Sequence, residues 1–247
     1  MKKFVLLSLI LVVLGSLMVA SVSCSSAPTK VQVATDATWF PFEYVNSETS
    51  VIEGFDIDVM NAIAARANLD IEFINVAWDP LLAGMAQGTY QCAISCITIT
   101  PERAAEMLFS SPYYTAGQMV VVLKSNTTFT SKDNLTGDVG AQLGTTGAME
   151  VENLSGCTLK NYDEIGLAFQ DLMNGQISAV ICDAPVAKGY VNQNPNSLKT
   201  IGEMFTTENY GVAVAKGNEA LLAKINAAIE ALIREGVIDQ YAAEWLS

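Results

Sequence analysis

Residues 91–103, QCAISCITITPER, bring two cysteines, two threonines and an arginine into one short segment. A metal or redox site is one interpretation of Cys92 and Cys96. On one extended strand, however, four residues span about 13 Å, whereas the Cα atoms of a disulfide lie within about 7 Å. The chain has no histidine to help hold a metal, and Cys157 and Cys182 fall on predicted strands that flank a central one. We therefore expect free thiols and no metal, with Cys92 in the core and Cys96 lining a site.

The end of this segment, Thr100 to Arg103, predicts the start of a helix. Threonine is a good N-cap and proline suits the first helical position. Arg103 then lies in the first turn, where the helix dipole disfavours a cation by up to about 1 kcal/mol. Either Arg103 is a surface residue paired with Glu102 or Glu106, or it turns into a cleft and binds an anion. A guanidinium fork at a helix start matches both oxygens of a carboxylate, and Thr98 adds a hydroxyl.

Polar and aromatic residues elsewhere have the same two interpretations, structural or functional. Residues 144–147, GTTG, either cap a helix or present backbone N–H groups to a ligand; they lack the lysine and the spacing of a phosphate-binding loop. Asp183 either begins a turn or supplies a negative charge for a ligand cation. Trp39 and Trp78, each predicted in a loop after a strand, either fill the core or provide aromatic faces for a ligand side chain.

Strands and helices alternate along the chain and must position these residues. Strands are predicted at the start of 31–40 and over 70–78, 92–99, 138–144, 157–163 and 177–183, and helices over 54–69, 80–88, 148–154, 164–175 and 218–247. Such alternation is typical of a mostly parallel sheet flanked by helices. Because it occurs twice, on either side of residues 118–135, we expect an α/β fold with two lobes.

A short internal similarity places four of the candidates at equivalent positions. Aligning Gly88 with Gly175 puts Ser95–Cys96 opposite Cys182–Asp183, each pair at the end of a predicted strand. Open α/β sheets bind ligands at the carboxyl ends of their strands. We therefore expect these residues to face a common site.

The first residues predict export. A short basic start precedes the apolar run 4–20, and small residues then lead to Cys24. This pattern is typical of a cleaved signal peptide over 1–24, although a retained anchor is the alternative. Cys24 resembles the acylated cysteine of bacterial lipoproteins, but Ser21 stands where such signals usually carry leucine. Residues 25–30 suit a flexible tether.

Composition excludes several classes of function. Without Lys2 and Lys3 the chain has 11 basic and 26 acidic residues, a net charge of −15, so nucleic acid is not an expected partner. No second apolar run reaches the roughly 18 residues that span a bilayer. Because histidine is absent, Ser-His-Asp and Cys-His catalysis and histidine-ligated metals are excluded. A chain of 247 residues can bury a proper core in one large domain or two small lobes.

Together these features resemble the extracellular solute-binding proteins of ABC transporters that bind polar amino acids, family 3. The matching segments are ATDATWFPFEY, GFDIDVMNAIA, AISCITITPERAAEMLFSSPYYTAG, VGAQLGTTGA, LAFQDLMNGQISAVICD and YGVAVAKGN. The resemblance covers about residues 31–247. It implies a type II periplasmic-binding-protein fold, with lobe 1 formed by 28–116 and 213–247, lobe 2 by 117–212, and the ligand in the cleft between them.

The resemblance also implies the residues that contact the ligand. They are Asp36, Trp39, Trp78, Ser95, Cys96, Thr98, Arg103, Gln142, Thr145, Thr146 and Asp183. Arg103 binds the α-carboxylate, Thr145 and Thr146 add contacts to it from the second lobe, and Asp183 holds the α-ammonium. A buried zwitterion needs both charges paired, because an unpaired buried ion costs several kcal/mol.

Four departures from the family pattern make the ligand harder to infer. Gln91 and Ser178 stand where relatives carry structural aspartates, Cys96 replaces a small residue at the cleft floor, and Cys182 lies beside Asp183. Two tryptophans and Asp36 favour a basic side chain, arginine or lysine, whereas Gln142 and Cys96 are equally compatible with glutamine.

The expected function is transport rather than catalysis. A monomer without cofactor binds the amino acid outside the cytoplasmic membrane, closes about its hinge and delivers the ligand to an ABC permease, while lipid on Cys24 anchors it in the periplasm or at the cell surface. Two alternatives are a sensor domain and an enzyme resembling cyclohexadienyl dehydratase, which needs a general acid in the cleft. Asp36, Asp183 and Glu43 are the candidates for that acid.

Overall fold

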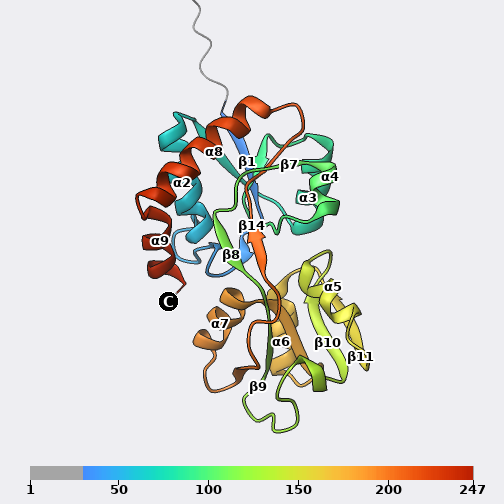
Figure 1. The fold of residues 1–247 in the computed structure, drawn as a ribbon. Helices are drawn as coiled ribbons and strands as arrows, with labels where there is room; N and C mark the ends of the chain where they lie inside the picture. The colour runs from blue at the N-terminus through green and yellow to red at the C-terminus, as the bar shows by residue number, and fades with distance from the viewer. Residues whose placement is uncertain (1–29, 247) are drawn as a thin grey trace, which may run out of the picture.

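The computed structural model describes residues 30–246 and shows two lobes, one above the other in Figure 1. We define lobe 1 by the sheet β5-β1-β6-β15-β7 and lobe 2 by the sheet β11-β10-β12-β9-β13. The α/β architecture expected from the alternation of strands and helices is confirmed. In each sheet three neighbouring strands are parallel, β5, β1 and β6 in lobe 1 and β11, β10 and β12 in lobe 2. One further strand runs antiparallel to both of its neighbours, β15 in lobe 1 and β9 in lobe 2.

Lobe 1 is built from both ends of the described chain. Its sheet contains β1 (Val31–Thr35), β5 (Ile71–Asn75), β6 (Cys92–Ala93), β7 (Leu108–Phe109) and β15 (Ala213–Val214). Its helices are α2 (Phe55–Ala67), α3 (Trp78–Gln87), α4 (Pro101–Glu106), α8 (Glu219–Arg234) and α9 (Val237–Trp245), and a small sheet joins β2 (Thr38–Trp39), β3 (Glu43–Val45) and β4 (Ile52–Glu53). Helices α2, α8 and α9 pack together on one side (Figure 1).

Lobe 2 is formed by one continuous stretch of chain. Its sheet contains β9 (Gln118–Leu123), β10 (Gly137–Gln142), β11 (Cys157–Tyr162), β12 (Ala179–Asp183) and β13 (Leu198–Ile201). Its helices are α5 (Thr146–Glu152), α6 (Ile165–Met173) and α7 (Ala184–Gln193), with a single 3-10 turn, η1 (Lys132–Asn134). Strand β10 lies between β11 and β12, so the strands of Cys157 and Cys182 flank a central strand, as predicted.

Two antiparallel strands connect the lobes. They are β8 (Tyr114–Ala116) and β14 (Glu208–Tyr210), and Figure 1 shows them side by side between the two sheets. Tyr210 also forms an antiparallel bridge with Thr98 of lobe 1. The connection therefore places residues of β14 against the segment that the sequence marks as the candidate site.

The cores follow the two-residue period of buried strands. Val33 of β1 packs in the cluster that contains the inner face of α2, whereas its neighbour Ala34 packs with α3. In β12, Val180 packs with α6 and Ile181 with α5. Because successive side chains point to opposite faces, a strand covered by helices on both sides must be apolar at every position. The continuous apolar runs in the sequence have this origin.

The predicted strand 92–99 is wrong beyond its first residues. Strand β6 ends at Ala93, and Cys96 adopts a left-handed conformation with φ of 48°. The chain therefore bends at Ser95–Cys96 instead of extending to Ile99. The four described cysteines, Cys92, Cys96, Cys157 and Cys182, are nevertheless free, as predicted.

The positions of the two tryptophans also need a correction. Trp39 lies in the short strand β2, and Trp78 is the first residue of helix α3, which begins earlier than predicted. Neither therefore lies in a loop. Both side chains are nonetheless buried.

The predicted signal peptide, the lipidated Cys24 and nearly all of the tether 25–30 lie outside the described residues. Within residues 30–246, none of the helices is both long and apolar enough to cross a bilayer.

Candidate binding site between the lobes

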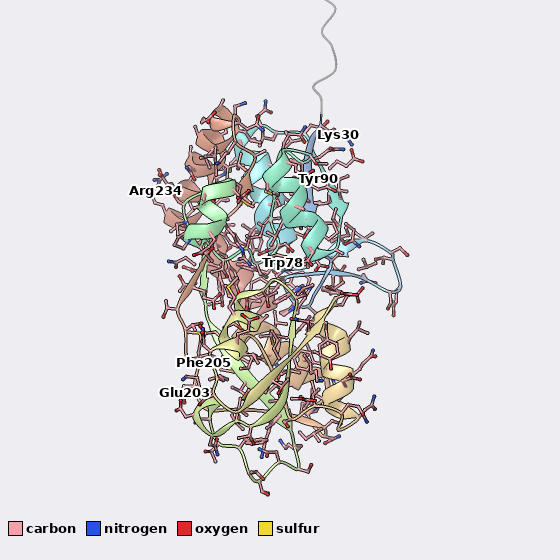
Figure 2. The ribbon with its side chains drawn as sticks, turned by 90° about the vertical axis from the view of Figure 1, so that its right-hand side faces the viewer. Lys30, Trp78, Tyr90, Glu203, Phe205 and Arg234 are labelled. Atoms are coloured by element: carbon pink, nitrogen blue, oxygen red, sulfur yellow. The ribbon has the colours of Figure 1, made fainter. Side chains whose placement is uncertain are left out.

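One pocket between the lobes collects most of the predicted site residues. It is lined by Trp39, Trp78, Ser95, Cys96, Thr98, Arg103, Thr145, Thr146 and Asp183. Figure 2 shows Trp78 where α3 of lobe 1 approaches lobe 2. The other two predicted residues, Asp36 and Gln142, do not line this pocket but are hydrogen-bonded beside it. The structure thus brings together residues that are far apart in the sequence.

Arg103 faces the pocket because of how its helix begins. The hydroxyl of Thr100 caps α4 by accepting from the Arg103 backbone N–H at 3.2 Å, and Pro101 occupies the first turn. The guanidinium donates to the backbone oxygens of Thr98 at 2.9 Å and Gly144 at 3.2 Å, and it lies 5.1 Å from the Trp78 ring centroid. The surface interpretation of Arg103 is therefore wrong: its side chain is buried.

The charge of Arg103 is held in an unfavourable environment. Burial lowers the pKa of its guanidinium, although the negative charges of Asp183 and Glu208 partly oppose this. Among the described residues, no carboxylate oxygen comes within 4.0 Å of its nitrogens. A buried cation without a direct ion pair is energetically costly. An anion placed beside Arg103 in the pocket offsets that cost.

Asp183 supplies the opposite charge from lobe 2. It ends β12 and occupies the N-cap position of α7, but its side chain makes no capping bond and points to the pocket. Its oxygens accept from Gln118 Nε2 and from the Tyr210 hydroxyl. Burial, with the nearby negative charge of Glu208, raises the pKa of Asp183 to about 7. A cation placed beside it stabilises its charged form.

Gln142 forms hydrogen bonds with both Trp39 and Asp36 on one side of the site. Its Oε1 accepts from the Trp39 indole N–H at 2.6 Å, and its Nε2 donates to Asp36 Oδ2 at 3.0 Å. Asp36 also accepts from the Thr38 hydroxyl at 2.9 Å, and burial raises its pKa. This bridge crosses from lobe 2 to lobe 1 and orients both the aromatic wall and a carboxylate.

Two further acids lie behind Ser95 and Cys96. Glu43 accepts from the Ser95 hydroxyl at 2.8 Å and lies 3.9 Å from the Cys96 sulfur. Asp56 accepts from the Cys96 backbone N–H and the Tyr113 hydroxyl, each at 2.8 Å. Burial and the charge of Asp56 raise the pKa of Glu43 well above its usual range, and burial raises the pKa of Asp56 to about 7. The two carboxyl groups therefore resist carrying charge at the same time, and the pKa of Glu43 is the one that its neighbour's charge raises.

The GTTG segment is both a helix cap and a wall of the pocket. Thr145 caps α5 by accepting from the Ala148 backbone N–H at 3.2 Å, and its hydroxyl donates to the Gln142 backbone oxygen at 2.7 Å. Thr146 donates its hydroxyl proton to Glu208 at 2.7 Å. The capping interpretation of this segment is therefore confirmed, and Thr145 and Thr146 also line the pocket, while their contact with a ligand stays a prediction.

Sequence reasoning missed Glu208 and Gln118. Both are buried, and both lie in or beside the connection between the lobes. Gln118 donates to Asp183 and, at 3.0 Å, to Glu208. Nothing in the segment around Glu208, TTENYGVAV, marks a site; only the pairing of β14 with β8 brings this residue to the pocket.

The fold and the site define a two-lobed α/β protein in which two opposite buried charges line the pocket between the lobes. Comparisons with known proteins identify its family. Residues 31–247 match the model of the bacterial extracellular solute-binding proteins, family 3, and the chain belongs to that family. It is 35% identical over 223 residues to a probable histidine-binding protein of Neisseria gonorrhoeae, covering 87% of this chain and 82% of that protein.

Two further proteins are similar to this chain over nearly their full length. The ABC transporter arginine-binding protein 1 of Escherichia coli K12 is 31% identical over 239 residues, 94% of this chain and 97% of the relative. The solved structure of an ancestral arginine-binding protein bound to arginine superposes with a TM-score of 0.84 at 38% identity, covering 88% of this chain and 98% of that one.

Proposed function

We propose that the protein binds a polar L-α-amino acid in the pocket between its lobes. The observation that carries this proposal is the pair of buried, opposite charges, Arg103 from lobe 1 and Asp183 from lobe 2, lining one pocket. Arg103 takes the α-carboxylate through its fork of N–H groups, and Asp183 takes the α-ammonium. Neither buried charge has a direct ionic partner within the described residues, so a zwitterion stabilises both.

A basic side chain is the preferred ligand side chain, with glutamine second. Trp39 and Trp78 offer aromatic faces, and Asp36 a buried carboxylate beside them. A guanidinium or ammonium gains from both. Gln142 favours glutamine as the ligand, because its side-chain amide can hydrogen-bond to the side-chain amide of a glutamine ligand. Relatives named for histidine and arginine support a basic ligand.

The bound amino acid passes to an ABC permease. A ligand that touches both walls stabilises the closed arrangement of the lobes over an open one. We propose that the strands β8 and β14 are the hinge, that the protein acts as a monomer, and that lipid on Cys24 holds it at the membrane. The last point concerns a residue outside the described part of the chain.

A screen of the twenty amino acids by thermal shift, followed by calorimetry with arginine, lysine and glutamine, tests the proposal. We expect saturable binding without turnover and tightest binding of a basic amino acid. Asp36→Ala should weaken arginine at least about tenfold and leave glutamine nearly unchanged. Unchanged arginine affinity in this variant contradicts the role of Asp36, and chemical conversion of a ligand points instead to an enzyme.

A further inference from the structure

Glu208 is a buried carboxylate that four donors surround. Its Oε2 accepts from the hydroxyls of Thr98 and Thr146, each at 2.7 Å. Its Oε1 accepts from the hydroxyl of Thr206 at 2.9 Å and from Gln118 Nε2 at 3.0 Å. A carboxylate offers about four acceptor sites and no proton. The shell around Glu208 is therefore complete, and its position does not line the pocket.

This shell fixes the direction of two hydroxyl groups that do line the pocket. A threonine hydroxyl has a single proton, and Thr98 and Thr146 both direct theirs to Glu208. Thr98 then presents only oxygen lone pairs to the pocket. The oxygen of Thr146 also lies 3.2 Å from Gln118 Nε2, whose two protons are directed to Asp183 and Glu208. Lone pairs attract the N–H groups of an ammonium and repel a carboxylate oxygen.

We propose that Glu208 is a positioning residue that sets the polarity of the site. By holding the protons of Thr98 and Thr146, it turns the Thr98 hydroxyl into an acceptor and directs the ligand ammonium to that wall. The ligand carboxylate is left to Arg103. This inference rests on the proposed function, since it requires a ligand that carries both charges.

The Glu208→Gln variant tests the proposal because it replaces one acceptor oxygen by an N–H₂ donor. The new N–H₂ faces Thr98 and Thr146, because a hydroxyl can reverse and accept whereas Gln118 Nε2, on the other side, can only donate. The reversed hydroxyls then point their protons into the pocket. The measurement is the dissociation constant, by calorimetry, for L-arginine and for 5-guanidinopentanoate, which is arginine without its α-amino group. We expect wild type to discriminate strongly between the two. In Glu208→Gln the ratio of the two dissociation constants should fall by about tenfold or more, because only the affinity for L-arginine decreases.

The matched control is Glu203→Gln, which makes the same change at an exposed residue of lobe 2 (Figure 2). Its ratio should equal that of wild type. Equal weakening of both ligands in Glu208→Gln overturns the proposal, since it indicates a merely structural role. If wild type binds glutamine instead, the pair becomes L-glutamine and 5-amino-5-oxopentanoate. If wild type binds no amino acid, the proposed function itself fails.

A second variant keeps the test decisive if Glu208→Gln does not fold, which circular dichroism shows directly. Thr98→Val removes the acceptor oxygen and preserves the shape of the side chain. We expect it to narrow the same ratio by weakening L-arginine while leaving 5-guanidinopentanoate nearly unchanged. A parallel loss for both ligands contradicts the assignment of the Thr98 oxygen to the ammonium.

Discussion

Two pairs of buried acids flank the pocket, and they are built differently. The interlobe acids, Asp183 and Glu208, lie between the lobes, and donors from several elements surround them. The floor acids, Glu43 and Asp56, lie behind Ser95 and Cys96 within lobe 1, where the charge of Asp56 raises the pKa of Glu43. Glu43 accepts one hydroxyl bond and lies near one thiol, whereas Glu208 accepts four bonds.

The comparison shows how the surroundings of a buried carboxyl group decide whether it binds a ligand or supports the structure. Donors around a carboxylate favour its charged form, whereas burial beside a like charge favours the protonated form. Asp183 lines the pocket, where a ligand cation can favour its charged form. The floor acids do not line the pocket, and Asp56 instead holds the bend at Cys96 by accepting from its backbone N–H. Four experiments test this division, beginning with the largest expected effect.

Removing the charge of Asp183 should have the largest effect. In Asp183→Asn the ligand ammonium loses its buried partner, and breaking such a pair costs about 2–5 kcal/mol. We expect amino-acid affinity to fall by about 100-fold or more, measured by calorimetry. Asp239→Asn, the same change at an exposed position of α9, should bind like wild type. Near-normal affinity in Asp183→Asn contradicts the role of Asp183 as the partner of the ligand ammonium.

The affinity of wild type should fall in acid. The pKa of Asp183 is raised to about 7 in the free protein, and an ammonium pairs only with its carboxylate form. Below pH 7 ligand binding must therefore displace a proton. We expect the affinity to fall by up to about tenfold for each pH unit from 7 to 5 and to level off above pH 7.

Calorimetry in two buffers of different ionisation enthalpy measures the proton released at pH 6.5. Asp183→Asn should release no such proton, whereas Glu43→Gln should still release it. If Asp183→Asn still releases the proton and Glu43→Gln does not, the proton comes from the floor acids. That result contradicts the role given to Asp183.

Glu43→Gln should change stability rather than binding. Glu43 has a raised pKa when folded, so its stabilising contribution is complete below its unfolded pKa of about 4.3 and is lost as pH rises toward the folded value. Glutamine imitates the protonated acid and does not titrate. We expect a difference from wild type below about 1 kcal/mol at pH 5 and a relative gain for the variant at pH 8, measured by urea unfolding. If variant and wild type differ in free energy of unfolding by the same amount at pH 5 and at pH 8, Glu43 does not have a raised pKa.

The smallest effect concerns Cys96. Burial, with carboxyl groups nearby, raises the pKa of its thiol well above the usual range, and a thiol reacts as the thiolate. Iodoacetamide should therefore label Cys96 far more slowly than a thiol of the unfolded chain at pH 8, and bound ligand should slow it further. Mass spectrometry of peptides reports the rate, with the half-buried Cys157 as the internal reference. Rapid labelling contradicts a closed floor.

Much of the fold was predictable because its signals are local. The apolar face of residues 54–69 is the buried face of α2, including Val59, Met60 and Ile63. The cap at Thr100 predicts where α4 begins. The strand predicted over 92–99 is wrong for a physical reason. Its residues are apolar enough for a strand, but the bond from the Cys96 backbone N–H to Asp56, forty positions away, holds Cys96 at positive φ.

The site divides in the same way between local and distant signals. Arg103 and Asp183 stand at the ends of recognisable elements, so their positions in the sequence indicate a common edge of each lobe. Glu208 has no such signal, because its partner Thr98 is 110 residues away and only the return of the chain through β14 joins them. Sequence patterns predict which residues face a cleft better than which residues orient them.

The order of strands in lobe 1 has a consequence for how the exported chain matures. Strand β15 lies between β6 and β7, and α8 packs on α2, so the sheet and its covering layer include residues from both ends of the described chain. Lobe 2, in contrast, is one uninterrupted stretch. A chain that emerges from its amino end first can complete lobe 2 while lobe 1 still lacks a central strand. We expect lobe 1 to be finished last, and the pocket to form only when the final segment arrives.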